Sequence, residues 1–218
     1  MKNTKWISLS VIFILFIALN SYSQDKFSFH GGLSVPMSEF ADQDMGGATI
    51  GCTVGAYYVC PILKSDIGLF GGIDVFYNRL QGDVKDRIET EYNVANLDDQ
   101  RVRFPSYLNF PISGGINYET SINDNISLFA NMGVTVNFFK ITDLVIGEGG
   151  YDTERIYFIP EKVGYKMGGG VLIHNKTSIS INYLALGDHH GDGLSEFGEF
   201  EYSQKVDILS ITYGIIIK

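Results

Sequence analysis

The feature that most restricts the fold is a two-residue period in hydrophobicity along 126–139, ISLFANMGVTVNFF. Every even position from Ile126 to Phe138 is apolar, and the odd positions are mostly small or polar. Successive side chains of a β-strand point to opposite faces. This stretch therefore predicts a strand with one apolar face and one face of smaller, more polar residues.

The same alternation recurs along the rest of the chain. We predict eight strands, at 27–35, 48–60, 67–78, 102–118, 126–139, 162–174, 178–186 and 205–217. Most are longer than the strands of soluble proteins, which average about five to six residues. A tilted strand that crosses a bilayer needs about nine to eleven residues. An even strand number is also typical of single-chain bacterial outer-membrane barrels.

The connections between these segments alternate in length. Short connections are predicted at 61–66, 119–125 and 175–177, and long connections at 36–46, 79–101, 140–161 and 187–204. In an up-and-down barrel this places all short turns at one rim and all long loops at the other. Outer-membrane barrels have short periplasmic turns and long extracellular loops.

The direction of the apolar face decides between a soluble and a membrane barrel. In a soluble, lipocalin-like barrel the other face meets water and should be rich in Lys, Glu and Asp. Here it is mostly Gly, Ser, Thr and Asn, and the apolar face carries charges only at segment ends, such as Arg79 and Lys140. A Lys or Arg in mid-bilayer costs about 2–4 kcal/mol. The sequence thus predicts an all-β fold, an eight-stranded antiparallel up-and-down transmembrane β-barrel.

The N-terminus has the features of a secretory signal. Lys2 and Lys5 precede an apolar run over 6–19, and small residues follow at Ser21 and Ser23. The run is short for a membrane-spanning helix, although an N-terminal anchor helix is the alternative. We therefore expect a signal peptide at 1–23, an outer-membrane barrel domain at 24–218, and export to the cell outer membrane.

Several stretches resemble a known family. They are SYSQ at 21–24, YLNFPISGGINY at 107–118, ISLFANMGVTVNFF at 126–139 and VGYKMGGGVLI at 163–173. Over about 25–218 the chain is similar to the eight-stranded outer-membrane β-barrel proteins of Bacteroidetes-type bacteria, including the PorT-like group. The resemblance implies contact with outer-membrane lipid and lipopolysaccharide, the barrel-insertion machinery and secretion-system proteins. Such barrels usually end in an aromatic residue, whereas this chain ends in ITYGIIIK.

Charged residues are also predicted inside the barrel. Asp74, Arg103 and Lys166 have the parity of the inner face, as do His30 and His174. An eight-stranded barrel is just filled by its side chains, so we expect no wide pore. Buried charges need partners, which predicts an internal ion pair or network. Its role is then either a structural plug or, alternatively, a proton or ion path.

The stretch GDHHGDG at 187–193 is the weak candidate for a metal site, through Asp188, His189, His190 and Asp192. Imidazole and carboxylate groups bind divalent metals, but adjacent histidines in a Gly-rich surface loop seldom converge on one ion. We therefore predict no metal, cofactor or catalytic site. No outward-facing Ser, His and carboxylate combination is evident, so we expect no enzyme activity.

The overall charge of −9 and the lack of a Lys/Arg cluster argue against nucleic-acid binding. The sequence instead predicts a structural or surface-interaction role through long extracellular loops. An accessory role in a protein secretion or gliding system is the alternative that the resemblance implies. A soluble lipocalin-like binder of a hydrophobic ligand is the other alternative.

Overall fold

The computed structural model describes residues 25–62, 66–91, 102–142, 144–146, 152–156, 161–195 and 198–217. The predicted signal peptide at 1–23 lies outside these ranges. Among the described residues, no helix combines the length and apolar character needed to span a membrane.

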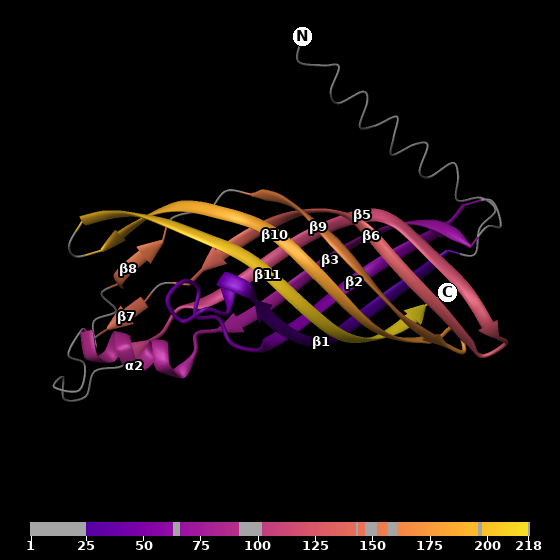
Figure 1. The fold of residues 1–218 in the computed structure, drawn as a ribbon, viewed down its shortest axis with the longest axis horizontal. Coiled ribbons are helices and arrows are strands. Elements are labelled where there is room, and N and C mark those ends of the chain that lie inside the picture. Colours follow the sequence, from indigo (N-terminus) through magenta and orange to yellow (C-terminus); the bar gives the residue numbers. More distant parts are fainter. Residues whose placement is uncertain are drawn as a thin grey trace, which may run out of the picture.

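Eight long strands form a closed barrel (Figure 1). They are β1 (Lys26–Met37), β2 (Gly51–Pro61), β3 (Ile67–Arg79), β5 (Ser106–Asn123), β6 (Ile126–Ile141), β9 (Lys162–Ile173), β10 (Thr177–Ser195) and β11 (Gly198–Ile217). Each pairs antiparallel with the next in chain order, and β11 pairs with β1. Closure leaves this wall no unpaired edge. The predicted eight-stranded antiparallel fold is confirmed.

The remaining elements lie at one end of the barrel, with the long connections (Figure 1). They are η2 (Ser38–Phe40), α2 (Gly82–Glu91), β4 (Val102–Arg103), β7 (Leu144–Ile146) and β8 (Asp152–Ile156). The three short strands extend the sheet from β10 through β8 and β7 to β4. We call this end the long-connection end, and the opposite end the short-turn end.

The apolar face of the alternation points away from the barrel axis. Val134 is 65% exposed and Ile112 is 49% exposed, whereas their neighbours Thr135 and Ser113 are buried. Every strand of the wall exposes large apolar side chains, for example Phe29, Val54, Ile73, Ile112, Val134, Val163, Ile181 and Ile215. A soluble barrel of the lipocalin type would have this face inside, so the structure contradicts that alternative.

The last hairpin is longer than predicted. Strands β10 and β11 pair continuously from Thr177↔Ile215 to Ser195↔Gly198, with one bulge between Ala185 and Gly187. The predicted loop at 187–204 is therefore wrong over its described residues. Charged and small side chains hide the alternation there, but an antiparallel ladder is held by backbone groups and tolerates them.

Two strand boundaries also differ from the prediction. The segment 102–118 is broken at Pro105, so that Arg103 lies on β4, which pairs with β7 outside the wall. Proline has no N–H for a ladder and is confined to the ends or edges of strands. In the second segment, β2 begins at Gly51, and Ala48 forms an isolated bridge with Leu80 instead.

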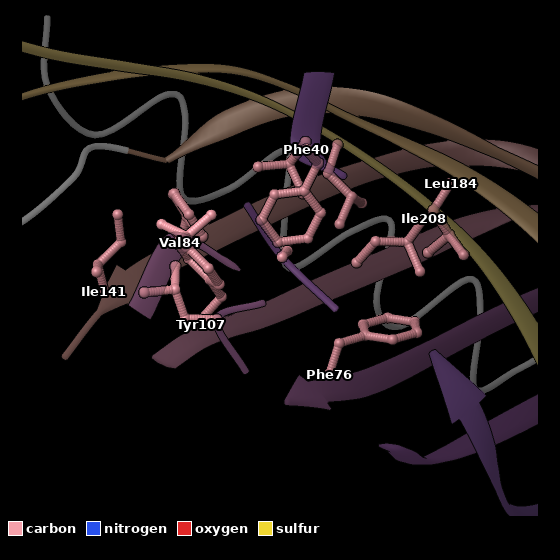
Figure 2. Close-up of a cluster of buried hydrophobic side chains, with 12 residues drawn as sticks. Phe40, Phe76, Val84, Tyr107, Ile141, Leu184 and Ile208 are labelled. Carbon is pink, nitrogen blue, oxygen red and sulfur yellow. The ribbon is translucent and has the colours of Figure 1, made fainter. Parts of the chain in front are cut away.

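An apolar cluster fills the inside of the long-connection end, and we call it the apolar cap (Figure 2). Its members are Phe40, Ala48, Phe76, Leu80, Val84, Tyr107, Phe139, Ile141, Leu184, Leu186, Val206 and Ile208. Phe40, from η2, is fully buried, and its ring centroid lies 5.2 Å from that of Tyr107 and 6.2 Å from that of Phe139. Burial of one such side chain contributes about 1.5–3 kcal/mol.

Hydrogen bonds fix the connection that carries Phe40. The Tyr107 hydroxyl donates to the Gly46 carbonyl. The Gln81 amide donates to the carbonyls of Ala41 at 2.6 Å and Ala48 at 3.1 Å. These bonds satisfy backbone acceptors that would otherwise be left without partners inside the barrel. Packed side chains and hydrogen bonds therefore close this end of the barrel.

Candidate functional site inside the barrel

The carboxylate of Asp74 contacts three side chains in the barrel interior. His30 Nε2 lies 2.6 Å from Asp74 Oδ1. The Tyr57 hydroxyl donates to Asp74 Oδ2 at 2.5 Å, and Lys166 Nζ donates to the same oxygen at 3.2 Å. The side chains of Asp74, Lys166 and His30 are 2%, 1% and 5% exposed. We call these four residues the Asp74 network.

The strand register brings most of this network together. His30 on β1, Gly55 on β2 and Asp74 on β3 lie in one row across the sheet. A Cβ at Gly55 would lie 2.5 Å from Asp74 Oδ1 and 2.6 Å from His30 Nε2, so only glycine leaves room for their contact. Likewise a Cβ at Gly72 would lie 1.8 Å from Cδ1 of the Tyr57 ring.

Lys166 reaches the network from β9, which does not pair with β1, β2 or β3. Its ammonium also lies 3.9 Å from the centroid of the Tyr57 ring, and that ring stacks on His30 at 4.4 Å. A buried ammonium without a partner is costly, and here it has a carboxylate and an aromatic face. The Asp74–Lys166 ion pair thus links opposite parts of the wall through the interior.

Of the charged residues predicted inside the barrel, the structure places some inside and others on the surface. Asp74 and Lys166 lie inside the barrel and form one ion pair. Arg103 is exposed on β4, because the break at Pro105 removes it from the wall and from the parity of β5. His174 is also exposed, in the turn between β9 and β10 with a φ of 52°. The prediction of an interior position is wrong for both.

Sequence reasoning did not assign Tyr57 to the network. Its signal was its parity, since it shares the inner face of its strand with Gly55. The sequence predicts an inward position for His30 but names no partner for it. Which inward residues meet across the lumen depends on strand tilt and register, and these are not readable from one strand alone.

The four weak metal candidates do not form one group. On β10, His189 is buried on the inner face, whereas Asp188 and His190 share the exposed outer face, with His190 Nε2 3.4 Å from Asp188 Oδ2. His189 Nε2 lies 3.1 Å from Asn137 Nδ2, and its ring lies 5.1 Å from Phe139. Asp192 pairs with Glu201 in the ladder. In the part of the chain that the structure describes, no three His, Cys, Asp or Glu residues are grouped for a metal ion.

Polar side chains fill the interior between the network and the apolar cap. Ser34 donates to Asn78 at 2.9 Å, and Asn137 donates to Asn109 at 2.8 Å. All four side chains are buried. From the Asp74 network to the long-connection end the barrel is therefore packed, first with polar and then with apolar side chains.

The other half of the interior contains a cavity of about 70 Å³. It lies between the Asp74 network and the short-turn end, since its lining comes from the turn-proximal parts of the strands. Lys26 on β1 and Glu119 on β5 also line it and form an ion pair with Nζ–O distances of 2.5 and 2.7 Å. In the part of the chain that the structure describes, the half of the interior near the short-turn end thus contains open space.

Comparisons with known proteins give structural neighbours but no family. No family model matches the sequence, and no curated protein matches it. The structure is similar to Neisserial surface protein A (NspA), with 10% identity and a TM-score of 0.53, over 89% of this chain and 96% of that one. It is also similar to the outer membrane protein OprG from Pseudomonas aeruginosa, with 10% identity and a TM-score of 0.54, over 91% and 99% of the two chains.

At such low identity the likeness concerns the fold alone. The resemblance to the Bacteroidetes-type and PorT-like proteins stays a prediction, since no family model supports it. The chain nevertheless spans nearly the whole of both neighbours. It has the closed eight-stranded antiparallel barrel fold that NspA and OprG share.

Proposed function

We propose that this chain is an integral outer-membrane β-barrel protein without a diffusion pore. The observation that carries the proposal is the exposure of large apolar side chains on all eight strands of the wall. Contiguous exposed apolar surface on this scale is unfavourable in water and matches the apolar band of membrane barrels. The fold shared with NspA and OprG supports the same environment.

The orientation follows from the connections. Short periplasmic turns and long extracellular loops are the rule in such barrels, which places the long-connection end outside the cell. The apolar cap then closes the outer end of the interior. Because the interior is closed there, we assign the protein a structural or surface-interaction role, exercised through the elements around the cap, and no transport through the barrel.

Cell fractionation and a heat-shift gel test this proposal. The protein should remain with the outer-membrane fraction after a carbonate wash. In detergent without heating it should migrate as a compact band that moves when boiled, because a closed barrel resists unfolding by detergent. Recovery in the soluble periplasm, with no heat shift, would contradict the proposal.

Two further parts of the proposal rest on sequence alone. Export by a signal peptide at 1–23 is tested by the N-terminus of the mature protein, expected at Gln24. The absence of enzyme activity is tested by mass spectrometry of lipid A from cells with and without the protein, which should be identical.

A role as an accessory of a protein secretion or gliding system is a finer proposal, and only the sequence resemblance favours it. Deleting the gene and comparing the secreted proteome separates it from a passive surface role. Loss of a set of secreted proteins supports the accessory role, whereas an unchanged secretome contradicts it.

A further inference from the structure

The outer face of the wall carries two cations without carboxylate partners at the long-connection end. Arg79 at the end of β3 and Lys140 near the end of β6 are both exposed, and they have the parity of the outward apolar side chains. Neither forms an ion pair with a described carboxylate, in contrast to four other cations, which are Lys26, Arg87, Lys166 and Lys205. The described part of the chain therefore leaves these two charges without a counter-charge.

The strand register places the two cations on either side of β5. Arg79 pairs with Ser106, and Lys140 pairs with Leu108 from the opposite side of the same strand. Neighbouring strands lie about 4.8 Å apart, so the two backbones are separated by about 10 Å across the sheet. Arginine and lysine have long, extended side chains. The two charges are therefore able to contact one anionic group that lies over β5.

Hydroxyl groups lie between the two cations. The hydroxyl oxygens of Tyr77 and Ser106 are 3.1 Å apart, so one of them donates to the other. The hydroxyl that accepts keeps its own proton for a further acceptor. The Arg79 guanidinium lies 5.9 Å from the centroid of the Tyr77 ring, which places it beside these hydroxyls. Guanidinium, ammonium and hydroxyl groups are donors that bind phosphate oxygens.

An apolar surface continues from this polar region toward the middle of the wall. Phe110 and Phe138 form the next outward pair of β5 and β6. Ile112 follows on β5 and pairs with Ile73 on β3. All four side chains are exposed on the outer face. An ion such as free phosphate would leave this surface uncovered, whereas a lipid places an anionic head at the cations and hydrocarbon along the apolar side chains.

We propose that Arg79 and Lys140 bind the phosphate group of a lipid in the outer leaflet of the outer membrane. The phosphate lies over β5, between the guanidinium and ammonium groups, and accepts hydrogen bonds from them and from the hydroxyl of Tyr77 or Ser106. The acyl chains lie along the exposed apolar side chains described above. The inference rests on the proposed membrane orientation, in which the long-connection end faces the outer leaflet.

Native mass spectrometry of the purified barrel in a neutral detergent tests the site. The barrel is titrated with phosphorylated lipid A and with the same lipid after enzymatic dephosphorylation. We expect saturable binding of the phosphorylated lipid and about tenfold weaker binding of the other, because the charge-assisted hydrogen bonds are lost. Equal binding of the two lipids would show that only acyl chains are bound and would overturn the proposal. Displacement of the lipid by an equal concentration of inorganic phosphate would also overturn it.

A matched pair of double variants separates this site from the general charge of the long-connection end. Arg79→Gln, Lys140→Gln should weaken binding of the phosphorylated lipid about tenfold. Arg87→Gln, Lys205→Gln removes the same charges at the same end, from side chains that have carboxylate partners, and should bind as the wild type does. Equal binding by the two variants contradicts the site. A normal heat shift without preference for the phosphorylated lipid refutes the site but not the membrane barrel.

Discussion

At the scale of single residues, the ion pairing inside the barrel depends on the carboxylate of Asp74. Replacing it with Ala leaves the Lys166 ammonium buried with no carboxylate partner. Breaking a buried ion pair in this way costs about 3–5 kcal/mol of unfolding free energy. The Asp74→Ala, Lys166→Met double variant should recover much of this loss, because no unpaired charge remains. Urea unfolding in detergent, followed by the heat-shift gel, measures both.

The matched control is Asp44→Ala, which removes an exposed ion pair with Arg87 on the outer surface. Exposed pairs contribute about 0–1 kcal/mol, so this variant should unfold almost as the wild type does. If Asp74→Ala and Asp44→Ala have the same effect, the Asp74 network does not hold the barrel together.

Residue parity alone predicted only part of the network. It placed Asp74 and Lys166 inside, and the structure pairs them. It also placed Arg103 inside. That prediction failed because Pro105 lies between Arg103 and the start of β5, so that Arg103 is not part of the wall ladder. The parity of a residue predicts which face of the strand its side chain lies on. To predict a contact across the lumen, one must also know the register between strands that are far apart in the sequence.

At the scale of one strand, the neighbouring glycines of β3 test the assignment of faces. A Cβ at Gly72 would collide with the Tyr57 ring inside the barrel, whereas a Cβ at Gly71 would have its nearest atom 4.0 Å away. Gly72→Val should lower the unfolding free energy by about 1–3 kcal/mol through overpacking. Gly71→Val should have little effect in the same urea titration, and the reverse order would contradict the assignment.

The element that carries the apolar cap is tested by Phe40→Ala. Phe40 is fully buried, so its truncation should cost about 3–5 kcal/mol in the same measurement. The control is Met45→Ala in the same connection, where the side chain is 59% exposed and the cost should be small. Similar stabilities for the two variants would show that the cap does not pack as described.

The apolar cap and the long final hairpin could not be predicted from alternation. Leu184, Leu186, Val206 and Ile208 point inward although they are apolar, and they break the rule that the inner face is small and polar. The bulge between Ala185 and Gly187 shifts the register there. These large apolar side chains are buried against Phe40, which lies far away in the sequence, on η2 between β1 and β2. The alternation within one strand does not reveal such a partner.

At the scale of the whole molecule, the sequence predicted the architecture well. Eight segments, alternating connection lengths and an uncharged apolar face were sufficient for the closed barrel and for the outward direction of its apolar side chains. These features repeat in every strand, so errors in one segment did not change the result. The interior is specified by single contacts, and it was correspondingly less predictable.

The central claim is that the outward apolar face contacts lipid. Its most direct test is a nitroxide label at Val134 and, separately, at Thr135, with Cys52 and Cys60 replaced by Ser and Ala, in lipid bilayers. Oxygen, which concentrates in acyl chains, should relax the label at Val134 more than a water-soluble nickel complex does. At Thr135, inside the wall, both should have weak effects. Strong relaxation by the nickel complex and weak relaxation by oxygen at Val134 would contradict the account.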